Sequence, residues 1–254
     1  MMPIWLVAGL WGLLSASGLV LGAVGAQVLP LSHRGVAYAT AFGSGVLVAI
    51  LSLGLVADAV RQGGLVPAAL GVVVGATAFS AVNWWLSKRG AHDRKRCGEC
   101  VEQPTEAGVP GSGAVIAAGS VIDGVPEAFV LGLTVAAGGA PSLAFVAGFF
   151  LAGVPEGLSA SAGMWRADRS KRYVYSLWAV VVAVSGAAAV AGRFLGERLS
   201  SDAVAVVTAV ASGALLAMLV ETMIPEAFAD APVMIGLITA IGFLTGVGLV
   251  TLGG

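Results

Sequence analysis

Six acidic residues of this 254-residue chain lie inside long apolar segments or at their ends. If such segments cross a bilayer, a charge near its middle costs at least ~2.5–3.5 kcal/mol, so embedded carboxylates normally face a cavity and mark the path of an ion or proton. No Lys or Arg falls inside the same segments, which makes a cation from outside the chain their natural partner. The six residues are Asp58, Asp123, Glu127, Glu156, Glu221 and Glu226.

Three of these acids share a local pattern, in which Val or Ile precedes Pro-Glu and a small residue follows, at 125–128, 154–157 and 224–227. Proline inside a helix removes one backbone hydrogen bond and pushes away the carbonyl four residues earlier. Each pattern therefore offers a carboxylate near a freed carbonyl. The carbonyls concerned belong to Ile122, Leu151 and Glu221.

Asp123 and Glu127 are four residues apart, which places them on one helix face with their Cβ atoms about 5–6 Å apart. That spacing is suited to gripping one ion, and we expect both to converge with Glu156 near the middle of the membrane. The alternative is that the prolines only kink their helices and the glutamates are protonated and bonded to neighbours. For Asp58, a solvated acid at a helix end is an equally good interpretation.

The composition indicates the kind of fold that positions these acidic residues. Hydrophobic residues make up 58% of the chain and charged residues 11%, with a mean hydropathy of +0.96. An ordinary soluble domain carries about 25% charge, so the medium is lipid. The 37 glycines, including pairs four apart such as Gly18 and Gly22, predict close helix packing. A net charge of −1 excludes a basic nucleic-acid surface.

Apolar stretches long enough to cross about 30 Å of hydrocarbon recur along the chain. They predict an all-α polytopic membrane protein, with residues 1–254 forming a single transmembrane domain of eight helices and a polar connector at 88–111. The predicted spans are approximately 3–29, 36–60, 65–87, 112–138, 141–164, 173–192, 203–227 and 232–252.

Basic residues are distributed unevenly between alternate loops. Ten of the thirteen Lys and Arg residues fall after the first, third and fifth spans, and only Arg61, Arg193 and Arg198 fall in the other loops. Because loops rich in Lys and Arg stay in the cytoplasm, the connector 88–111 is predicted to be cytoplasmic and both termini exterior. We expect an integral protein of a bacterial inner membrane.

The motifs also resemble those of a known family. Residues 120–132 resemble the His-Asn-x-Pro-Glu-Gly helix of ZIP metal transporters, 149–161 are similar to that family's next helix, and 220–227 resemble its Glu-x-x-Ile-Pro-Glu-Ala segment. The resemblance implies a 3+2+3 helix bundle, often homodimeric, in which the fourth and fifth helices build the metal site. It further implies slow, carrier-like passage of zinc, iron or manganese into the cytoplasm.

By position, Glu127 and Glu156 match the family's Pro-Glu carboxylates, and Glu221 matches an acid that approaches the site. Asp123 stands where a histidine is usual, and Gly124 replaces the asparagine. On the fifth helix, Ala152 and Gly153 occupy the histidine position and the next polar position.

Both histidines of the chain, His33 and His92, lie in predicted loops. An all-oxygen site shifts preference from Zn²⁺ toward harder ions such as Mn²⁺, Mg²⁺ or Ca²⁺, although carboxylates also bind zinc. The identity of the metal therefore stays open. A divergent homologue that does not transport metal, or that senses it, is the alternative function.

The connector contains Cys97-Gly-Glu-Cys100, with His92 nearby. A four-coordinate structural zinc site needs four protein ligands, so an unmetallated loop is favoured over a regulatory zinc site. An enzyme is disfavoured because the chain has no His-Glu-x-x-His and no Gly-x-Ser-x-Gly motif.

Overall fold

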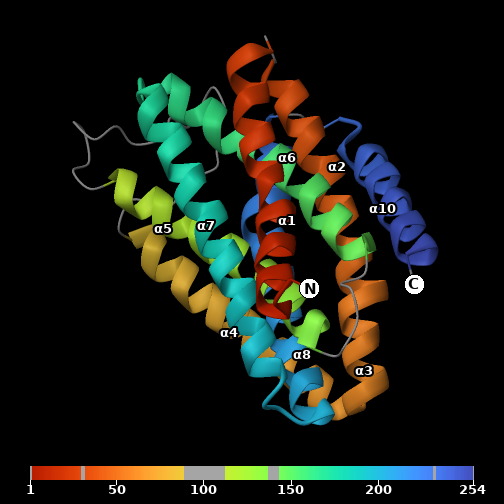
Figure 1. Cartoon of the computed structure of the whole chain (residues 1–254). Coiled ribbons are helices and arrows are strands. Elements are labelled where there is room, and N and C mark those ends of the chain that lie inside the picture. The colour runs from red at the N-terminus through yellow and green to blue at the C-terminus, as the bar shows by residue number, and fades with distance from the viewer. Residues whose placement is uncertain (1, 30–31, 89–111, 137–142, 231–232, 254) are drawn as a thin grey trace.

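The computed structural model describes residues 2–29, 32–88, 112–136, 143–230 and 233–253, and this part of the chain is helical without strands (Figure 1). The helices are α1 (Ile4–Val28), α2 (His33–Ala49), η1 (Ile50–Val56), α3 (Ala57–Gly63), α4 (Leu65–Leu86), α5 (Ser112–Ala136), α6 (Leu143–Arg166), α7 (Lys171–Gly196), α8 (Ser201–Met218), η3 (Leu219–Met223), α9 (Ile224–Asp230) and α10 (Ile235–Leu252).

These helices form eight spans in the described residues. The π-helical segment η1 joins α2 and α3 into one span, His33–Gly63, and η3 joins α8 and α9 into another, Ser201–Ala229. All eight spans are long and apolar enough to cross a membrane. The predicted all-α polytopic membrane protein with eight spans is therefore confirmed.

Helix ends follow local sequence signals. Ser32, Ser170 and Ser200 precede α2, α7 and α8, and each side chain accepts a hydrogen bond from the backbone N–H three residues later, at 3.2–3.3 Å. Between α3 and α4 the chain turns at Gly64, whose φ of +83° is a backbone conformation that favours glycine. These signals separate spans that would otherwise be continuous apolar sequence.

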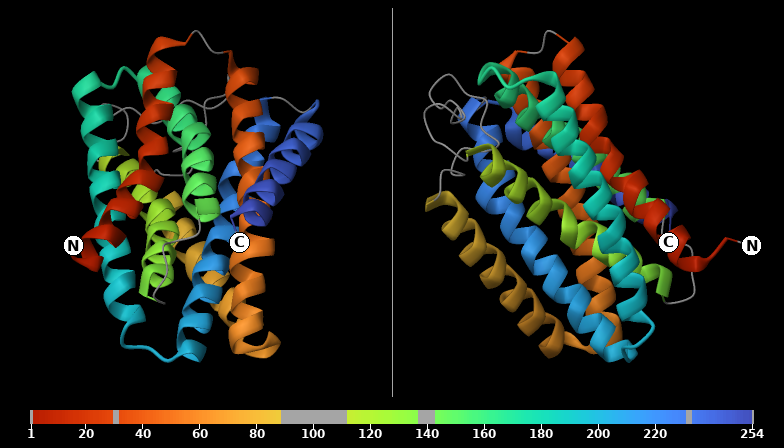
Figure 2. Two further views of the ribbon diagram at one scale, coloured as in Figure 1. Left: turned by 45° about the vertical axis from the view of Figure 1, so that its right-hand side comes forward. Right: turned by 60° about the vertical axis from the view of Figure 1, so that its left-hand side comes forward.

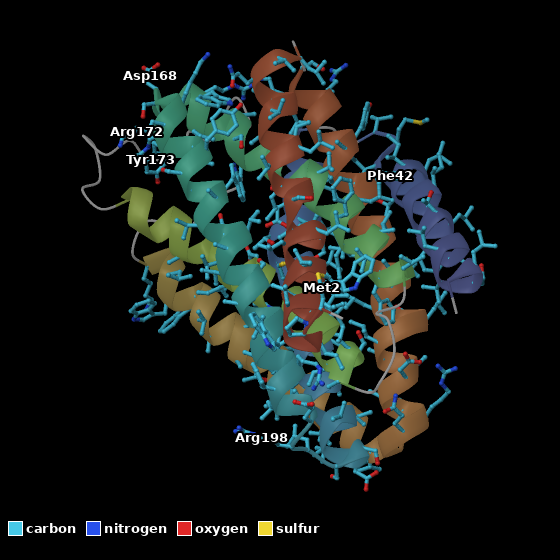
Figure 3. All side chains as sticks on the ribbon, in the orientation of Figure 1. Met2, Phe42, Asp168, Arg172, Tyr173 and Arg198 are labelled. Carbon is cyan, nitrogen blue, oxygen red and sulfur yellow. The ribbon has the colours of Figure 1, made fainter. Side chains whose placement is uncertain are left out.

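The expectation that every basic residue lies outside the spans was wrong: within the described residues, the spans include Arg34, Arg61, Arg166, Lys171, Arg172 and Arg193, mostly at their ends. Arg61 lies in the last turn of the second span, and Arg193 is buried in α7, where its Nη2 pairs with the Glu197 carboxylate at 2.6 Å. Both spans run about one turn further than predicted, and each carries an ion pair at that end. Figure 3 shows Arg172 and Arg198 near opposite ends of the bundle.

The spans pack as two groups of helices that share an interface. In one, α1 packs mainly against α6 and α7, and α5 packs against α7; in the other, α2 packs against α10 and α4 against α8. Contacts of α2 with α6 and of α5 with α8 join them. The two views of Figure 2 show the helices side by side, with α4 at an edge of the bundle. The most buried span is α6.

Reciprocal glycines bring the paired helices together. A Cβ atom added to Gly75 of α4 would lie 1.8 Å from the Val210 carbonyl oxygen of α8, and one added to Gly213 of α8 would lie 2.0 Å from the Val72 oxygen of α4. Close backbone approach is how helices gain contact in lipid, where apolar side chains have no water to avoid. The same arrangement occurs at Gly18, Gly22 and Gly157 between α1 and α6, at Gly45 and Gly242 between α2 and α10, and at Gly132 and Gly192 between α5 and α7.

Replacing Gly75 by Ala is expected to destabilise the bundle, because the added methyl group overlaps a backbone oxygen that no side-chain rotation can move. Overpacking of this kind costs about 1–3 kcal/mol. Each kcal/mol lowers Tm by about 2–4 °C in a chain of this size. Thermal unfolding in detergent measures the shift. Gly248→Ala is the control, since nothing lies within 4 Å of a Cβ at Gly248; equal Tm values for the two variants would contradict the packing argument.

Candidate functional site

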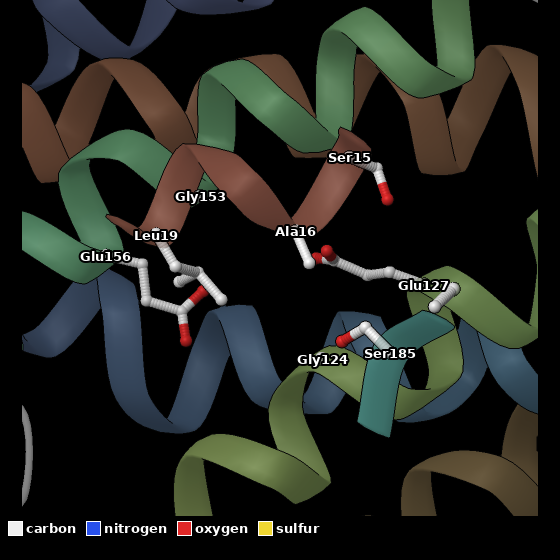
Figure 4. A pocket seen from close by; sticks show the side chains of 9 residues that line it. Ser15, Ala16, Leu19, Gly124, Glu127, Gly153, Glu156 and Ser185 are labelled. Atoms are coloured by element: carbon white, nitrogen blue, oxygen red, sulfur yellow. The ribbon is translucent and has the colours of Figure 1, made fainter. Parts of the chain in front are cut away.

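A small cavity lies between α1, α5, α6 and α7 (Figure 4). Its volume is about 10 Å³, near the lower limit for holding one water molecule. Its polar wall consists of two carboxylates and two hydroxyls, and its remaining wall is apolar or glycine. The residues that line it are Ser15, Ala16, Leu19, Gly124, Glu127, Ala128, Gly153, Glu156 and Ser185.

Two Pro-Glu carboxylates from different helices meet at this cavity. Glu127 follows Pro126 in α5, and Glu156 follows Pro155 in α6; both helices continue through their prolines. Glu156 is only 7% exposed, and Glu127 is partly buried. The two glutamates therefore line the same cavity, and their sharing of a metal site stays a prediction.

Glycines on α1 and α6 set the position of the α1 wall. A Cβ atom at Gly18 would lie 2.2 Å from the Phe150 carbonyl oxygen, and one at Gly157 would lie 2.1 Å from the Leu19 oxygen. The backbone of α1 therefore lies directly against the turn of α6 that carries Glu156. This contact is what brings Ser15 and Leu19 into the cavity wall.

Asp123 and Glu226 are buried but do not line this cavity. Asp123, one turn before Glu127 in α5, is 1% exposed, and Glu226 in α9 is 4% exposed. Ser120, three residues before Asp123, and Ser159, three residues after Glu156, are buried as well. Asp123 thus shares a helix face with Glu127 without reaching the space between Glu127 and Glu156.

Glu221 and Asp58 are engaged elsewhere. The Glu221 carboxylate accepts hydrogen bonds from the Ser80 hydroxyl and from Asn83 Nδ2, the latter at 2.8 Å, so it is directed toward α4. Asp58 pairs with Arg61 one turn later in the same helix. For Asp58 the structure supports the solvated helix end, and the assumption that no basic residue was available to it was wrong.

The group expected from the sequence, with Asp123, Glu127 and Glu156 together and Glu221 close by, is not assembled in the described residues. Among them, no three Asp, Glu, His or Cys side chains are close enough to hold a metal ion. Glu127 and Glu156 line one cavity instead, whereas Glu221, in the π-helical turn, is directed toward α4.

Sequence reasoning missed Ser15 and Ser185, since neither belongs to a motif. Ser185 is 1% exposed and Ser15 is 3% exposed, in helices without an embedded acid. Isolated serines are ordinary in membrane helices, so only the packing of α1 and α7 onto the glutamates distinguishes these two.

The segment with His92, Cys97 and Cys100 lies outside the described residues. His33 lies at the start of α2, where its Nδ1 is 2.9 Å from Nη1 of Arg166.

No protein-family model matches the chain. No curated protein matches it significantly either.

Proposed function

We propose that this membrane protein carries a divalent metal cation through the bundle, and that Glu127 and Glu156 bind the ion in transit. One observation supports this most directly: two embedded carboxylates, contributed by two proline-containing helices, line the same small cavity. Two negative charges at one place inside a membrane protein are costly unless a cation or protons balance them. A divalent cation balances both.

The size and the chemistry of the cavity support a bare ion over a larger solute. About 10 Å³ of space admits one water-sized occupant. Its polar atoms are all oxygens, and such sites favour hard cations such as Mn²⁺, Mg²⁺ or Ca²⁺, while Zn²⁺ and Fe²⁺ also accept carboxylate ligands. Inward transport agrees with the resemblance of the Pro-Glu motifs to those of ZIP transporters. The ten-to-three distribution of basic residues favours exterior termini.

Uptake of Mn²⁺ by proteoliposomes tests this function. The purified protein is expected to accumulate Mn²⁺ faster than protein-free liposomes and to saturate with concentration, because a carrier has a finite number of sites. Cys97 and Cys100, the only cysteines of the chain, report its orientation when labelled by a thiol reagent that does not cross the membrane.

Equilibrium binding of Mn²⁺ to the detergent-solubilised protein separates two failures. Binding without uptake identifies a metal sensor rather than a carrier. Absence of binding to the correctly folded protein, for Mn²⁺, Zn²⁺ and Mg²⁺ alike, contradicts the proposed site itself.

A further inference from the structure

The hydroxyl of Ser185 in α7 is placed differently from those of the buried serines Ser44 and Ser212. Ser44 and Ser212 donate to the backbone carbonyl four residues earlier, at 2.8 Å each, which is the usual way for serine to satisfy its proton in a membrane helix. Ser185 makes no such bond within the described structure, although it is 1% exposed. Its oxygen is therefore not committed to its own helix.

Ser185 instead faces the carboxylate cavity. It lines the wall beside Gly124, and a Cβ atom at Gly124 would lie 3.2 Å from Ser185 Oγ (Figure 4). That distance is crowded, so the absence of a side chain at Gly124 leaves the space that the hydroxyl occupies. Gly124 and Glu127 are three residues apart in α5 and share a helix face, so Ser185 lies against the turn that carries Glu127.

Ser15 supplies a second hydroxyl from α1. Its Oγ donates to the Gly12 carbonyl at 3.0 Å, which uses its only proton. A hydroxyl oxygen that has donated its proton still has lone pairs to offer. The cavity wall thus holds oxygens from four helices: carboxylates from α5 and α6, and hydroxyls from α1 and α7.

We propose that Ser185 is a ligand of the transported ion, together with Glu127 and Glu156 and supported by Ser15, and that this set of oxygens selects hard divalent cations over soft ones. The inference rests on the proposed function and adds a specificity-determining residue to it. Hydroxyl and carboxylate oxygens suit Mn²⁺ and Mg²⁺, whereas soft ions such as Cd²⁺ prefer sulfur. Replacing the hydroxyl oxygen of residue 185 by sulfur is therefore expected to shift this preference toward Cd²⁺.

The experiment compares Ser185→Cys with Ser212→Cys in a Cys97→Ser, Cys100→Ser background, so that each protein carries a single thiol. Ser212 is a matched control, since it is also 1% exposed and does not line the cavity. Equilibrium binding of Cd²⁺ and Mn²⁺ is measured for each purified full-length protein. Ser185→Cys is expected to raise the Cd²⁺/Mn²⁺ affinity ratio by about tenfold or more, as changes at metal sites commonly do.

Two further readouts keep the proposal falsifiable. The ultraviolet charge-transfer band of a cadmium–thiolate bond is expected for Ser185→Cys and not for Ser212→Cys. If Ser185→Cys does not fold, Ser185→Ala removes only the oxygen and is expected to lower Mn²⁺ affinity about tenfold.

The possible failures are distinguishable. If the Cys97→Ser, Cys100→Ser protein binds Mn²⁺ and loses this binding on Glu127→Gln, while Ser185→Cys shows neither a band nor a changed ratio, the role of Ser185 is overturned and the proposed function stands. A folded Ser185→Ala protein with undiminished Mn²⁺ affinity overturns it equally. If the Cys97→Ser, Cys100→Ser protein binds no metal, the proposed function fails, and the inference fails with it.

Discussion

Replacing Glu156 by Gln is expected to reduce Mn²⁺ binding and uptake by a factor of ~10² or more. The change keeps the shape of a side chain that is 7% exposed and removes its charge. Removing one partner of a buried charge pair costs about 3–5 kcal/mol, because the remaining charge is left uncompensated. A cation between Glu127 and Glu156 would lose one of its two compensating charges, and the same loss is expected for Glu127→Gln. Initial uptake rates and equilibrium binding measure both effects.

Two matched variants make this expectation specific. Glu197→Gln is the same chemical change at an exposed position outside the cavity, and it should leave Mn²⁺ affinity at the parental level. Glu221→Gln tests whether the π-helical turn matters: its carboxylate is held by Ser80 and Asn83 of α4, so a small effect is expected. If Glu156→Gln and Glu197→Gln bind Mn²⁺ equally well, Glu156 is not a ligand.

Much of the fold was predictable, because crossing a bilayer leaves a strong signal in the sequence. Apolar runs set the number of spans, and the helix ends were approximately correct. The spans that end near Arg61 and Arg193 run about one turn further than predicted, and each of these arginines pairs with an acidic residue three or four positions away. The abundant glycines indicated close packing, but which helices they join depends on reciprocal positions such as Gly75 and Gly213.

The candidate site was predictable only in part. Glu127 and Glu156 stood out because a carboxylate following proline in an apolar helix is unusual, and repetition strengthened that signal. The other acids were harder to place, because interpreting the sequence as regular α-helix does not predict the π-helical segment η3. A π-helical turn holds one residue more than an α-helical turn, which changes the directions in which Glu221 and Glu226 point around the helix axis. Glu221 faces α4, and Glu226 is buried in α9.

Acidification is expected to release the ion. It should lower Mn²⁺ affinity more than the removal of any single hydroxyl ligand does. A carboxylate binds metal in its deprotonated form, so protons and Mn²⁺ compete for Glu127 and Glu156. As the pH falls and both carboxylates take up protons, binding must displace them, and affinity decreases. Mn²⁺ affinity is therefore highest at pH values where both carboxylates are deprotonated, and it is lost as the pH falls and they become protonated. Displacing two protons lowers affinity by up to ~100-fold for each pH unit, and displacing one lowers it by ~10-fold.

The slope of the logarithm of Mn²⁺ affinity against pH gives the number of ligands that titrate. In Mn²⁺ titrations from about pH 8 to about pH 5, at constant ionic strength, the parental protein is expected to approach the two-proton slope over part of the range. Glu156→Gln leaves one titrating glutamate and should halve the slope on a logarithmic scale, whereas Glu197→Gln should keep the parental slope. Thermal unfolding at each pH identifies any loss of affinity caused by unfolding. A folded parental protein whose Mn²⁺ affinity stays constant through the pH range in which its buried carboxylates take up protons would exclude binding through these carboxylates, because Mn²⁺ and protons would then not compete.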